Sequence, residues 1–403
     1  MTPEIKHRIE KIRHGNVPEG YQKTKDGIFP TDWHTQKMKQ WVALAERPVT
    51  LEDDKRYRLV TVRRGFGGVD LRGEYLGKDI LVKNYFRARQ GDFLISKRQI
   101  AHGACGVVPE SLDGAVVSNE YNVFVPNQGT NIEMFNLMMQ LPHYTRLFYL
   151  MSDGVHIEKL LFKTQDWMRR QLAMPPIEEQ QKIAAILTTQ DKVIELKEKR
   201  LAEKQRQKKY LMQQLLTGKK RLPGFAFEVE KTNIKAISTY SVSTISQTML
   251  ESYEGKQLYP VFNANSIAGY VDFYENECPY ISIIKDGAGI GRVRLCEAKS
   301  STIGTMGCIH ARKGISIIFL YYLLEQVDFN KYSNGSTIPH LYYKDYSCEK
   351  VRIPDIKEQA AIAEVLSTAD REIELLQQDI EQEKQKKKAL MQLLLTGIVR
   401  VKT

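Results

Sequence analysis

The chain has 403 residues, of which 42% are hydrophobic and 27% are charged, and its formal net charge is +11. This length is sufficient for two or three domains that each have a core. No apolar run reaches the roughly 18–20 residues of a membrane span, and the charged N-terminus does not resemble a secretory signal, so neither a membrane protein nor a secreted protein is expected. The five cysteines include no CxxC pair, which disfavours a disulfide framework or a zinc ribbon and fits a reducing cytoplasm.

Residues 1–174 form the first expected domain. Short runs rich in β-branched residues at 58–62, 92–96 and 122–126 predict strands, and the segment 135–150 predicts a helix, so a mixed α/β domain is expected. This segment holds 26 Lys and Arg against 20 Asp and Glu. A basic surplus is typical of proteins that bind a polyanion, most simply nucleic acid.

Residues 175–218 predict one long helix. Pro175 precedes an acidic first turn, Gly218 suits the left-handed position that ends a helix, and apolar residues recur every seven positions between them. Lys208 interrupts this pattern inside a basic cluster at 204–209, where the lysines would either lie in solvent or contact DNA phosphates. The expected seam of a coiled coil consists of Ile183, Leu187, Ile194, Leu201, Leu211 and Leu215.

Residues 219–353 form the second expected domain, again of mixed α/β structure. Strands are predicted at 280–284 and 291–295 and a helix at 315–326. The pattern S-[DN]-G-x-x-I-x-x-L-x-[FY]-K occurs at Ser333 and at Ser152 in the first domain, but little other similarity connects the two domains. They are therefore expected to be unlike. The acidic and basic residues of 223–353 balance at 13 each, so this domain would need individually placed contacts to recognise DNA.

Residues 354–403 predict a second long helix that is a copy of the first. The segment from Pro354 to Gly397 aligns without a gap, and so at one constant offset, with the segment from Pro175 to Gly218, which indicates an internal duplication. The two helices are expected to pair antiparallel, with the domains at opposite ends; the alternative is that each helix packs on its own domain. The expected seam of this copy consists of Ile362, Leu366, Ile373, Ile380, Leu390 and Leu394, and Lys387 interrupts it as Lys208 does in the first copy.

Polar residues next to the predicted strands are the candidate DNA contacts. Arg and Asn can pair with guanine and adenine edges, whereas Lys and Ser more often hold phosphates. An exposed or fold-capping role is the alternative for each of them. In the first domain the candidates are Arg63, Arg64, Lys97, Arg98, Gln99, His102, Asn119 and Tyr121. In the second domain they are Asn263, Asn265, Lys285, Arg292, Arg294, Ser333, Asn334, Ser336 and His340.

Catalytic residues and metal ligands are not expected. Asp286, Glu297 and Lys299 imitate the acid and Glu-x-Lys array of a metal-dependent nuclease, but Glu-x-Lys also occurs at Glu4 and Glu195, so the signal is weak. No methylation motif and no glycine-rich cofactor motif is present. The alternatives kept open are a metal-dependent nuclease and a structural coiled-coil adaptor that recognises no sequence.

Several motifs of the chain resemble those of the DNA specificity subunits of type I restriction–modification systems. The pattern P-x-I-x-E-Q-x-x-I-A stands at Pro175 and Pro354, and L-M-Q-x-L-L-T-G stands at Leu211 and Leu390. RLPGF at 221–225, IFPTDW at 28–33, YPVFNANSIAGYVDFY at 259–274 and YSNGSTIPHL at 332–341 are similar to phrases of the recognition domains. The resemblance implies two target-recognition domains, residues 1–174 and 219–353, separated by two long antiparallel helices, residues 175–218 and 354–403.

The resemblance also implies a function and a set of partners. Each domain would recognise one half of an asymmetric, bipartite DNA site, and the helices would set the distance between the halves. The subunit itself would be non-catalytic and cytoplasmic. It would recruit two methyltransferase subunits and then the restriction and translocation subunits, and those partners would bind S-adenosylmethionine, ATP and Mg²⁺.

Overall fold

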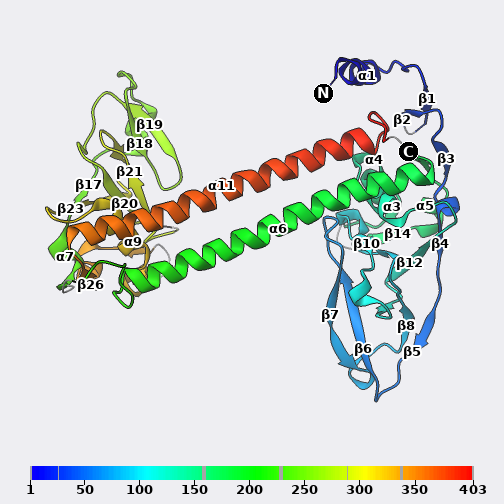
Figure 1. Cartoon of the computed structure of the whole chain (residues 1–403), viewed down its shortest axis with the longest axis horizontal. Helices are drawn as coiled ribbons and strands as arrows, with labels where there is room; N and C mark the ends of the chain where they lie inside the picture. Colours follow the sequence, from blue (N-terminus) through cyan, green and yellow to red (C-terminus); the bar gives the residue numbers. More distant parts are fainter. Residues whose placement is uncertain are drawn as a thin grey trace. The chain divides into compact units, whose positions relative to one another are not determined.

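The computed structural model describes residues 2–25, 27–156, 160–226, 230–287, 289–335 and 339–401. The chain forms two compact units: unit 1 comprises residues 1–196 and 380–403, and unit 2 comprises residues 197–379. The division passes through both long helices, so each unit contains one mixed domain together with part of each helix (Figure 1).

The two long helices are present as predicted. α6 (Ile177–Leu215) and α11 (Ile356–Leu394) each have 39 residues and begin two residues after the proline that opens the repeat. Gly218 and Gly397 adopt φ values of 67° and 69°. This left-handed conformation after the last turn lets a following N–H reach back to a free carbonyl, as Val399 N does to Leu393 O at 2.9 Å. The repeat therefore encodes the start and the end of each helix.

In unit 1 the first part of α6 packs antiparallel against the last part of α11 (Figure 1). Ile183 and Leu187, near the start of α6, share one hydrophobic core with Leu394, at the end of α11. Lys387 Nζ lies 2.5 Å from the Asp191 carboxylate and connects the same two segments. The start of one helix is thus buried by the end of the other.

Unit 2 contains the reciprocal pairing. Leu215, at the end of α6, shares a core with Ile362 and Leu366, near the start of α11. Lys208 Nζ lies 2.7 Å from the Asp370 carboxylate. The gapless alignment of the two copies matches Lys208 and Asp370 with Lys387 and Asp191 of unit 1, so one ion pair has been duplicated along with the helices.

Polar contacts replace the apolar seam between the buried ends of the helices. They join Gln190 to Glu383, Lys197 to Asp379 and Lys204 to Glu372. The seam residues Ile183, Leu187, Ile194, Leu215, Ile362, Leu366, Ile380 and Leu394 are buried, and Leu201, Leu211, Ile373 and Leu390 are half-buried. Both interpretations of the two seam lysines were wrong: the side chains of Lys208 and Lys387 are only 17% and 21% exposed, because aspartates of the opposite helix hold them.

Each domain is built on a four-stranded antiparallel sheet with the same connectivity. The strand order is β10-β9-β12-β4 in the first domain and β21-β20-β23-β17 in the second. The strands of the first sheet are β4 (Val42–Leu44), β9 (Phe93–Ser96), β10 (Cys105–Val107) and β12 (Tyr121–Pro126). Those of the second are β17 (Ser238–Val242), β20 (Tyr280–Ile284), β21 (Val293–Cys296) and β23 (Met306–Ala311). The expectation of two unlike domains was therefore wrong, since buried strands accept many apolar sequences without a change of fold.

The elements around these sheets also match one to one. A short helix links a two-stranded sheet to the four-stranded one, a second helix follows the longest strand of the shared sheet, and a hairpin, a further helix and the return strand lead into the long helix. In the first domain these are β3 (His34–Lys37), α2 (Met38–Trp41), α3 (Ile132–Met139), β13 (Ser152–Asp153), β14 (Leu161–Phe162), α5 (Thr164–Met168) and β15 (Gln171–Met174). In the second domain they are β16 (Glu230–Asn233), α7 (Ile234–Ile237), α9 (Ile317–Glu325), β24 (Ser333–Asn334), β25 (His340–Leu341), α10 (Tyr343–Tyr346) and β26 (Lys350–Ile353).

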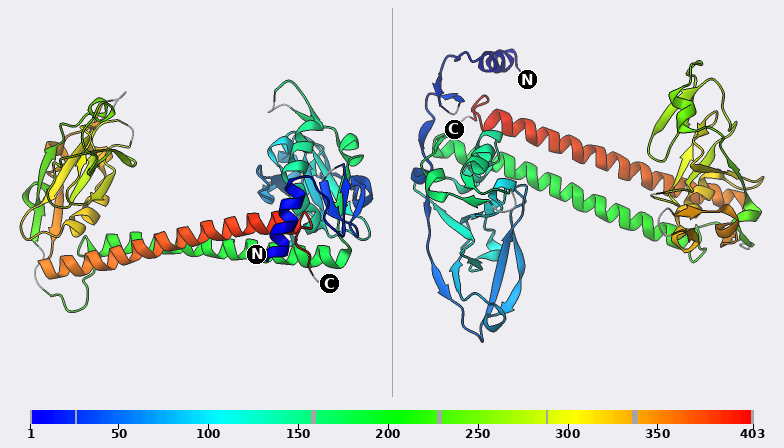
Figure 2. Two further views of the ribbon diagram at one scale, coloured as in Figure 1. Left: turned by 90° about the horizontal axis from the view of Figure 1, so that it is seen from above. Right: turned by 180° about the vertical axis from the view of Figure 1, so that it is seen from behind.

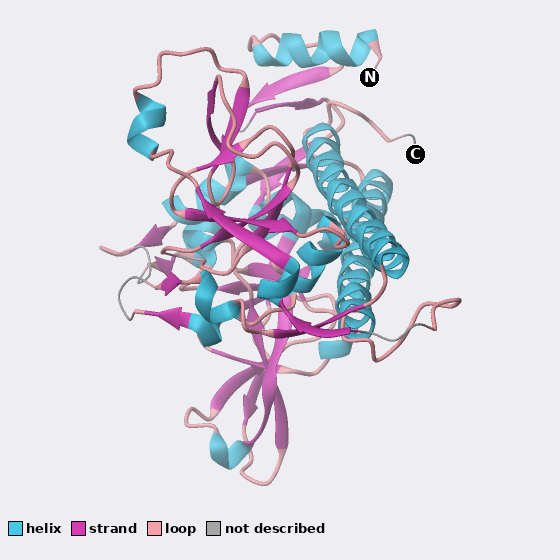
Figure 3. Cartoon of the chain, turned by 90° about the vertical axis from the view of Figure 1, so that its left-hand side faces the viewer, coloured by secondary structure: helices cyan, strands magenta, loops and turns pink. Residues whose placement is uncertain are grey.

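The domains differ in what is inserted into this shared frame. The first carries a five-stranded sheet, β5-β8-β11-β6-β7, that extends away from the long helices within unit 1 (Figures 1 and 2), and the second carries a three-stranded sheet, β19-β18-β22. The inserted strands are β5 (Pro48–Thr50), β6 (Arg56–Val62), β7 (Val69–Leu76), β8 (Asn84–Arg87), β11 (Val116–Ser118), β18 (Tyr259–Phe262), β19 (Ile267–Val271) and β22 (Ser301–Thr302). Figure 3 separates these strands from the helices by colour.

The remaining elements are short. They are α1 (Pro3–Arg13), β1 (Tyr21–Thr24), β2 (Gly27–Pro30), α4 (Pro142–Leu150) and α8 (Gln247–Glu251), with the 3₁₀ turns η1 (Gly77–Asp79), η2 (Ile100–His102), η3 (Glu110–Leu112) and η5 (Phe329–Tyr332). The single helix predicted at 135–150 is two helices, α3 and α4, because Pro142 lacks an N–H and disfavours helical geometry at the residue before it.

A buried aromatic residue occupies matching positions in the two cores. Trp167 is fully buried, and its ring lies against those of Phe124 and Phe148. Tyr346, which stands at the same distance before Pro354 as Trp167 does before Pro175, is 1% exposed and packs edge-on against Phe329. Both sit just before the strand that leads into a long helix, so the duplication also fixes how each domain is attached to its helix.

Candidate nucleic-acid interface

Many of the predicted DNA contacts gather at one end of the central strands of each four-stranded sheet, which we call the sheet edge. At this edge β9 or β20 ends and β12 or β23 begins, since Tyr121 pairs with Ser96 and Met306 pairs with Ile284. In an antiparallel pair, the residues after one strand lie beside those before its neighbour. Sequence positions that are well separated along the chain therefore meet in each domain.

In the first domain three predicted residues line one cleft at this edge. Lys97 follows β9, and Asn119 and Tyr121 stand at the start of β12; all three border a cleft of about 140 Å³. The neighbouring Arg98 is neutralised, because its Nε lies 2.7 Å from the Glu120 carboxylate. The edge thus offers an ammonium, an amide and a phenol in one place.

A second group of the first domain lies around the turn between β6 and β7. Arg63 and Arg64 begin this turn, and a backbone N–H of the turn donates to the His102 carbonyl oxygen at 2.7 Å. Gln99 immediately precedes η2, which contains His102. Arg63 forms an ion pair with Asp70, which reduces its capacity to attract a phosphate. The structure brings these four predicted residues together, but their charge is partly compensated.

In the second domain four predicted residues surround one cleft of about 270 Å³. Arg292, just before β21, and Arg294, on β21, meet Asn263 and Asn265 of the turn between β18 and β19. Arg292 Nη2 donates to Asn265 Oδ1 at 2.7 Å, and the Arg294 guanidinium lies 4.5 Å from the centre of the Phe262 ring. Both arginines are therefore held in place, although both are exposed.

A histidine and a lysine share one carboxylate at the same edge of the second sheet. Lys285 Nζ lies 2.7 Å from Asp286 Oδ2, and His340 Nδ1 lies 2.7 Å from Asp286 Oδ1. Burial raises the pKa of Asp286, but the hydrogen bonds from Lys285 and His340 outweigh it, so the net pKa lies below the usual value. This carboxylate is ionised at neutral pH and orients both neighbours.

The other candidates of the second domain lie on the hairpin β24–β25. Ser333 and Asn334 form β24, and Asn334 Nδ2 donates to Asp345 Oδ2 at 3.3 Å. Ser336 lies outside the described residues. Leu341 N–H donates to the Lys285 carbonyl oxygen at 2.8 Å, which attaches the hairpin to the sheet edge. The same contact occurs in the first domain, where the hairpin β13–β14 is bonded to Lys97 at 3.0 Å.

The residues that imitate a nuclease site do not come together. Asp286 lies two residues beyond the end of β20, whereas Glu297 follows Cys296, which pairs with Tyr280 at the start of β20. At about 3.3 Å per residue, the two carboxylates are separated by roughly 20 Å along the hairpin. Lys299 lies beyond Glu297, in the turn before β22. The proposed array was wrong, because the spacing in sequence spans the length of a hairpin.

One feature of unit 1 was not predicted from the sequence. It is an ion pair that joins the first turn of α6 to the residues after the end of α11, and we call it the Glu–Arg closure. Glu179, in the first turn of α6, is 1% exposed. Arg400, beyond the end of α11, binds its carboxylate with two hydrogen bonds, Nε to Oε1 at 2.8 Å and Nη2 to Oε2 at 2.7 Å. Arg400 also binds Asp32 at 2.7 Å, and this hydrogen bond lowers the pKa of Asp32. The buried carboxylate is thereby compensated.

Unit 2 repeats this closure. Glu358, in the first turn of α11, is 1% exposed, and Arg221, beyond the end of α6, binds it through Nε at 2.6 Å and through Nη2. Arg221 follows Gly218 at the same spacing as Arg400 follows Gly397. The signal was present in the sequence, since the alignment of the two copies extends past the glycines to these arginines.

The glutamine of the repeated Glu-Gln pair connects each long helix to its domain. Gln180 Nε2 donates to the Pro175 carbonyl at 2.8 Å, and its Oε1 accepts from the backbone of Asn131, the residue that caps α3, at 2.8 Å. Gln359 makes the matching bonds to Pro354 and to the backbone of Ser316, which caps α9, at 2.9 Å each. The repeated motif thus encodes the joints between the helices and the domains.

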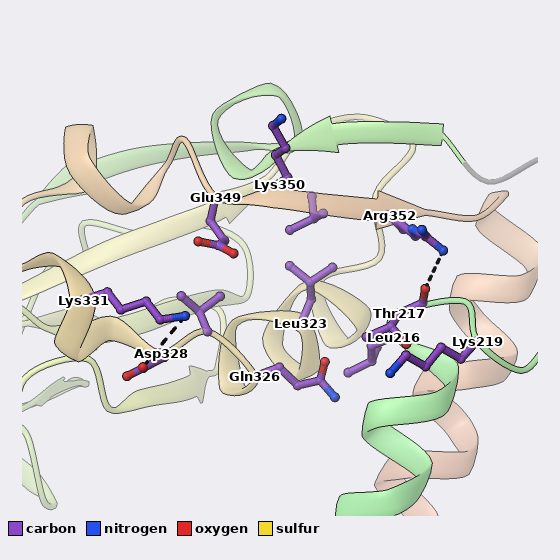
Figure 4. A pocket seen from close by; sticks show the side chains of 12 residues that line it. Leu216, Thr217, Lys219, Leu323, Gln326, Asp328, Lys331, Glu349, Lys350 and Arg352 are labelled. Atoms are coloured by element: carbon purple, nitrogen blue, oxygen red, sulfur yellow. Dashed lines mark hydrogen bonds and ion pairs between the residues drawn. The ribbon is translucent and has the colours of Figure 1, made fainter.

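A further cleft, of about 400 Å³, lies in unit 2 between the end of α6, α9 and β26 (Figure 4). It contains charges of both signs that bind each other or the backbone. Lys331 lies 4.0 Å from Asp328, and Arg352 donates to the Thr217 carbonyl at 3.1 Å. In Figure 4 the side chain of Lys350 extends to the side of β26 opposite Leu323. The bond from Arg352 attaches the residues after α6 to β26.

Comparisons with known proteins agree with this architecture. A family model described as the type I restriction modification DNA specificity domain matches residues 66–205 and, a second time, residues 227–385. The chain belongs to this family. Each match covers most of one mixed domain and the first part of the long helix that follows it, so the family is defined on the unit that is duplicated here.

Relatives and solved structures from the same family cover nearly the whole chain. The putative type I restriction enzyme MjaX specificity subunit of Methanocaldococcus jannaschii is 24% identical over 421 residues, which is 96% of this chain and 98% of that protein. The S subunit of a type I restriction–modification system from M. genitalium has a TM-score of 0.61 at 14% identity, over 92% of this chain and 97% of that one. A structure from work on complex assembly and conformational transition of the type I R-M system has a TM-score of 0.55 at 16% identity, over 92% of this chain and 99% of that one.

This specificity-domain protein contains, within its described residues, no helix that is both long enough and apolar enough to cross a membrane. The long helices α6 and α11 are polar on most of their surface, and their apolar residues face each other and the domains.

Proposed function

We propose that this chain is the DNA sequence-specificity subunit of a type I restriction–modification complex, and that each of its two domains recognises one half of an asymmetric site. The observation that carries the proposal is the pair of equivalent sheet edges. Each edge holds basic and amide side chains on the same frame, but with different residues and different insertions around it. Equivalent positions with different chemistry suit two different half-sites.

The proposed division of the chain is into a first recognition domain, residues 1–174, and a second, residues 219–353, with spacer helices at 175–218 and 354–403. The helices would determine how many base pairs between the half-sites are left unread. A helix of 39 residues extends about 58 Å at 1.5 Å per residue, which is between one and two turns of B-DNA at about 34 Å each.

The proposed partners supply the chemistry. Two methyltransferase subunits would bind S-adenosylmethionine, and translocase–nuclease subunits would bind ATP and Mg²⁺, while this chain remains non-catalytic and works in the cytoplasm. Membership of the family supports this assignment, and so does the fold likeness to a structure from work on assembly of a type I system. The separation of Asp286 from Glu297 removes the specific argument for a nuclease.

The proposed DNA contacts are those at the two sheet edges. In the first domain these are Lys97, Asn119 and Tyr121, with Arg63, Arg64, Arg98, Gln99 and His102 beside them. In the second domain they are Asn263, Asn265, Arg292 and Arg294, with Lys285 after β20 and Ser333, Asn334 and His340 on the adjoining hairpin; Ser336, outside the described residues, is also proposed. The first domain and α6 carry the positive charge of the chain and would supply most of the salt-dependent attraction.

Selection from random DNA tests the proposal. The purified chain is incubated with a library of duplexes that contain about 40 random base pairs, and bound DNA is sequenced over several rounds at increasing salt. The expected result is a motif in two conserved blocks separated by a fixed number of variable base pairs. A single block, or no enrichment at a salt concentration that removes nonspecific phosphate binding, would contradict the proposal and favour a structural adaptor.

A matched deletion tests the role of the helices. Residues 198–204 and 372–378 face each other, since Lys197 pairs with Asp379 and Lys204 with Glu372. Removing both heptads preserves the remaining contacts and shortens the pair by about 10 Å, or roughly three base pairs. The expected selection keeps both conserved blocks and changes the number of variable base pairs between them. An unchanged spacing would show that the helices do not set it.

A further inference from the structure

The cleft of the second domain contains two arginines without an acidic partner. Among the described residues that line it, none is acidic. Three arginines elsewhere in the chain are compensated by a carboxylate: Arg98 by Glu120, Arg221 by Glu358 and Arg400 by Glu179. Arg292 and Arg294 are therefore available to bind a group that only accepts hydrogen bonds.

The amide oxygens of the two asparagines of the cleft already accept hydrogen bonds from within the protein. Asn263 Oδ1 accepts from the backbone N–H groups of Asn265 and Ser266 at 2.9 Å and 2.8 Å. Asn265 Oδ1 accepts from Arg292 Nη2, and since a guanidinium has no acceptor, the amide oxygen and not its nitrogen must face it. Both asparagines offer their NH₂ group, which is a donor, and only Asn265 Oδ1 keeps a second lone pair.

The cleft consequently presents donors from four side chains. Arg292 Nη2 donates to Asn265 Oδ1 at 2.7 Å and to the Ala264 carbonyl at 2.9 Å, and these two bonds hold the side chain in place. Among the described residues, none is seen to accept a hydrogen bond from its other N–H groups. Arg294 stands two residues further along the strand, on the same face, above the Phe262 ring. Such fixed side chains lose little conformational entropy on binding.

Only one base edge in the major groove has acceptors and no donor or methyl group. Guanine presents N7 and O6, whereas adenine, cytosine and thymine present at least one donor or a methyl group. An asparagine favours adenine when both its oxygen and its NH₂ group are free to pair with the base, and here both amide oxygens already accept hydrogen bonds from the protein. We propose that this cleft recognises a guanine in the second half-site, that Arg292 makes the contact and that Asn265 is its positioning residue. The assignment rests on the proposed function.

A phosphate oxygen is also an acceptor, and base-modified DNA distinguishes the two. After selection with the unaltered chain has given the bipartite motif, each guanine of the second block is replaced in turn by 7-deazaguanine, which lacks the N7 acceptor, or by inosine, which retains N7 and O6. At one position 7-deazaguanine is expected to weaken binding about 10- to 100-fold, and inosine is expected to leave it nearly unchanged.

Two variants connect this position to the cleft. R292K keeps the charge but loses the planar donor group, and N265D places a carboxylate beside Arg292; both should lose the preference for guanine at that position and become insensitive to 7-deazaguanine there. The preferences in the first block should remain. R352K is the matched control, because Arg352 is exposed on β26, binds the Thr217 carbonyl and does not line the cleft.

Each outcome decides the assignment. One outcome is that R292K weakens binding to all sequences equally and reduces the slope of log K against log salt concentration by about one, the value for one phosphate contact. The acceptor is then a phosphate, and the guanine assignment is overturned. If R292K retains every base preference, Arg292 is not the contact. A wild-type chain that selects no sequence at all contradicts the proposed function itself, and with it this assignment.

Discussion

In the first domain the shared four-stranded sheet carries a five-stranded insertion and a basic surplus, whereas in the second it carries a three-stranded insertion and balanced charge. The joints to the long helices show the opposite: the same Glu–Arg closure and the same glutamine contacts recur at the aligned positions of both copies. The contrast shows which parts tolerate change. Buried polar contacts need all their partners, while an exposed sheet edge can exchange its side chains at little cost to folding.

The comparison also explains why the second domain can recognise DNA without a net positive charge. Its arginines Arg292 and Arg294 lie in a cleft without acidic side chains among its described lining residues, whereas Arg63 and Arg98 of the more basic first domain are ion-paired. The number of basic residues and their availability are separate properties. We therefore expect the first domain to contribute more to nonspecific attraction, and the second to depend on a few oriented contacts.

The largest expected effect follows from opening one Glu–Arg closure. In R400M the 1% exposed Glu179 loses its guanidinium partner, and the start of α6 should be destabilised by about 3 kcal/mol, a value at the lower end for buried pairs because the Arg400 side chain is 35% exposed. Hydrogen exchange of residues 177–187 should become roughly 100-fold faster.

The three tryptophans make this effect specific to one unit. Trp33, Trp41 and Trp167 all lie in unit 1, so the midpoint of denaturant unfolding monitored by tryptophan fluorescence should fall in R400M. The matched variant R221M opens the closure of unit 2 and should leave that midpoint in place while it accelerates exchange at 356–366. If R400M leaves exchange and midpoint unchanged, the closure does not hold the helix pair.

A smaller effect is expected from the glutamines. Q180M and Q359M keep the side-chain length but leave buried backbone groups of the prolines and of the helix caps without partners, which should cost about 1–3 kcal/mol in each unit. Exchange should increase at the start of α3 in Q180M and at the start of α9 in Q359M. Similar values in the two units would show that the joints are energetically equivalent, and an effect in one unit alone would refute this equivalence.

The duplicated lysine–aspartate pair should show a difference between the units. Lys208 contacts Asp370 at 2.7 Å and Glu325 at 3.3 Å, whereas Lys387 contacts Asp191, whose side chain is 46% exposed. K208M should therefore destabilise unit 2 by about 1 kcal/mol and K387M should destabilise unit 1 by less. Double-mutant cycles of K208M with D370N and with E325Q, and of K387M with D191N, measure each coupling energy, and no coupling between Lys208 and Glu325 would show that Glu325 contributes nothing.

Much of the scaffold could be predicted because its signals are local and occur twice. The heptads, the proline starts and the glycine ends located both α6 and α11, and each helix begins two positions after its proline. The middle of the seam was not predicted, because the periodicity of apolar residues does not reveal that Gln190, Lys197 and Lys204 face acidic residues of the other helix.

The common fold of the two domains could not be predicted from the sequence. Buried strands such as β9 and β20 share a pattern of apolar residues but few identities, and pairing between distant segments decides their order. At the candidate site, residue types selected Arg292 and Asn265 as possible DNA contacts. Their hydrogen bond could not be predicted, because it joins two turns that are distant in the sequence.

The smallest expected effect concerns a position of the sheet edges where the two domains carry opposite charges. Asp286 follows Lys285 as Arg98 follows Lys97, and each lysine carbonyl binds the adjoining hairpin. Because its pKa is lowered in the folded state, Asp286 contributes stability above its unfolded pKa of about 4, and this contribution disappears as the pH falls through the folded value. D286N should therefore be less stable than the wild type at pH 7, by under about 1 kcal/mol because the side chain is 30% exposed, and the two should converge as the pH falls through the folded pKa of Asp286. Hydrogen exchange of β20 and β25 measures the difference, with tryptophan fluorescence of unit 1 as the control that should not change. A difference that persists undiminished once Asp286 is protonated would mean that the loss arises from altered packing, and that the ionised carboxylate between Lys285 and His340 does not stabilise the second domain.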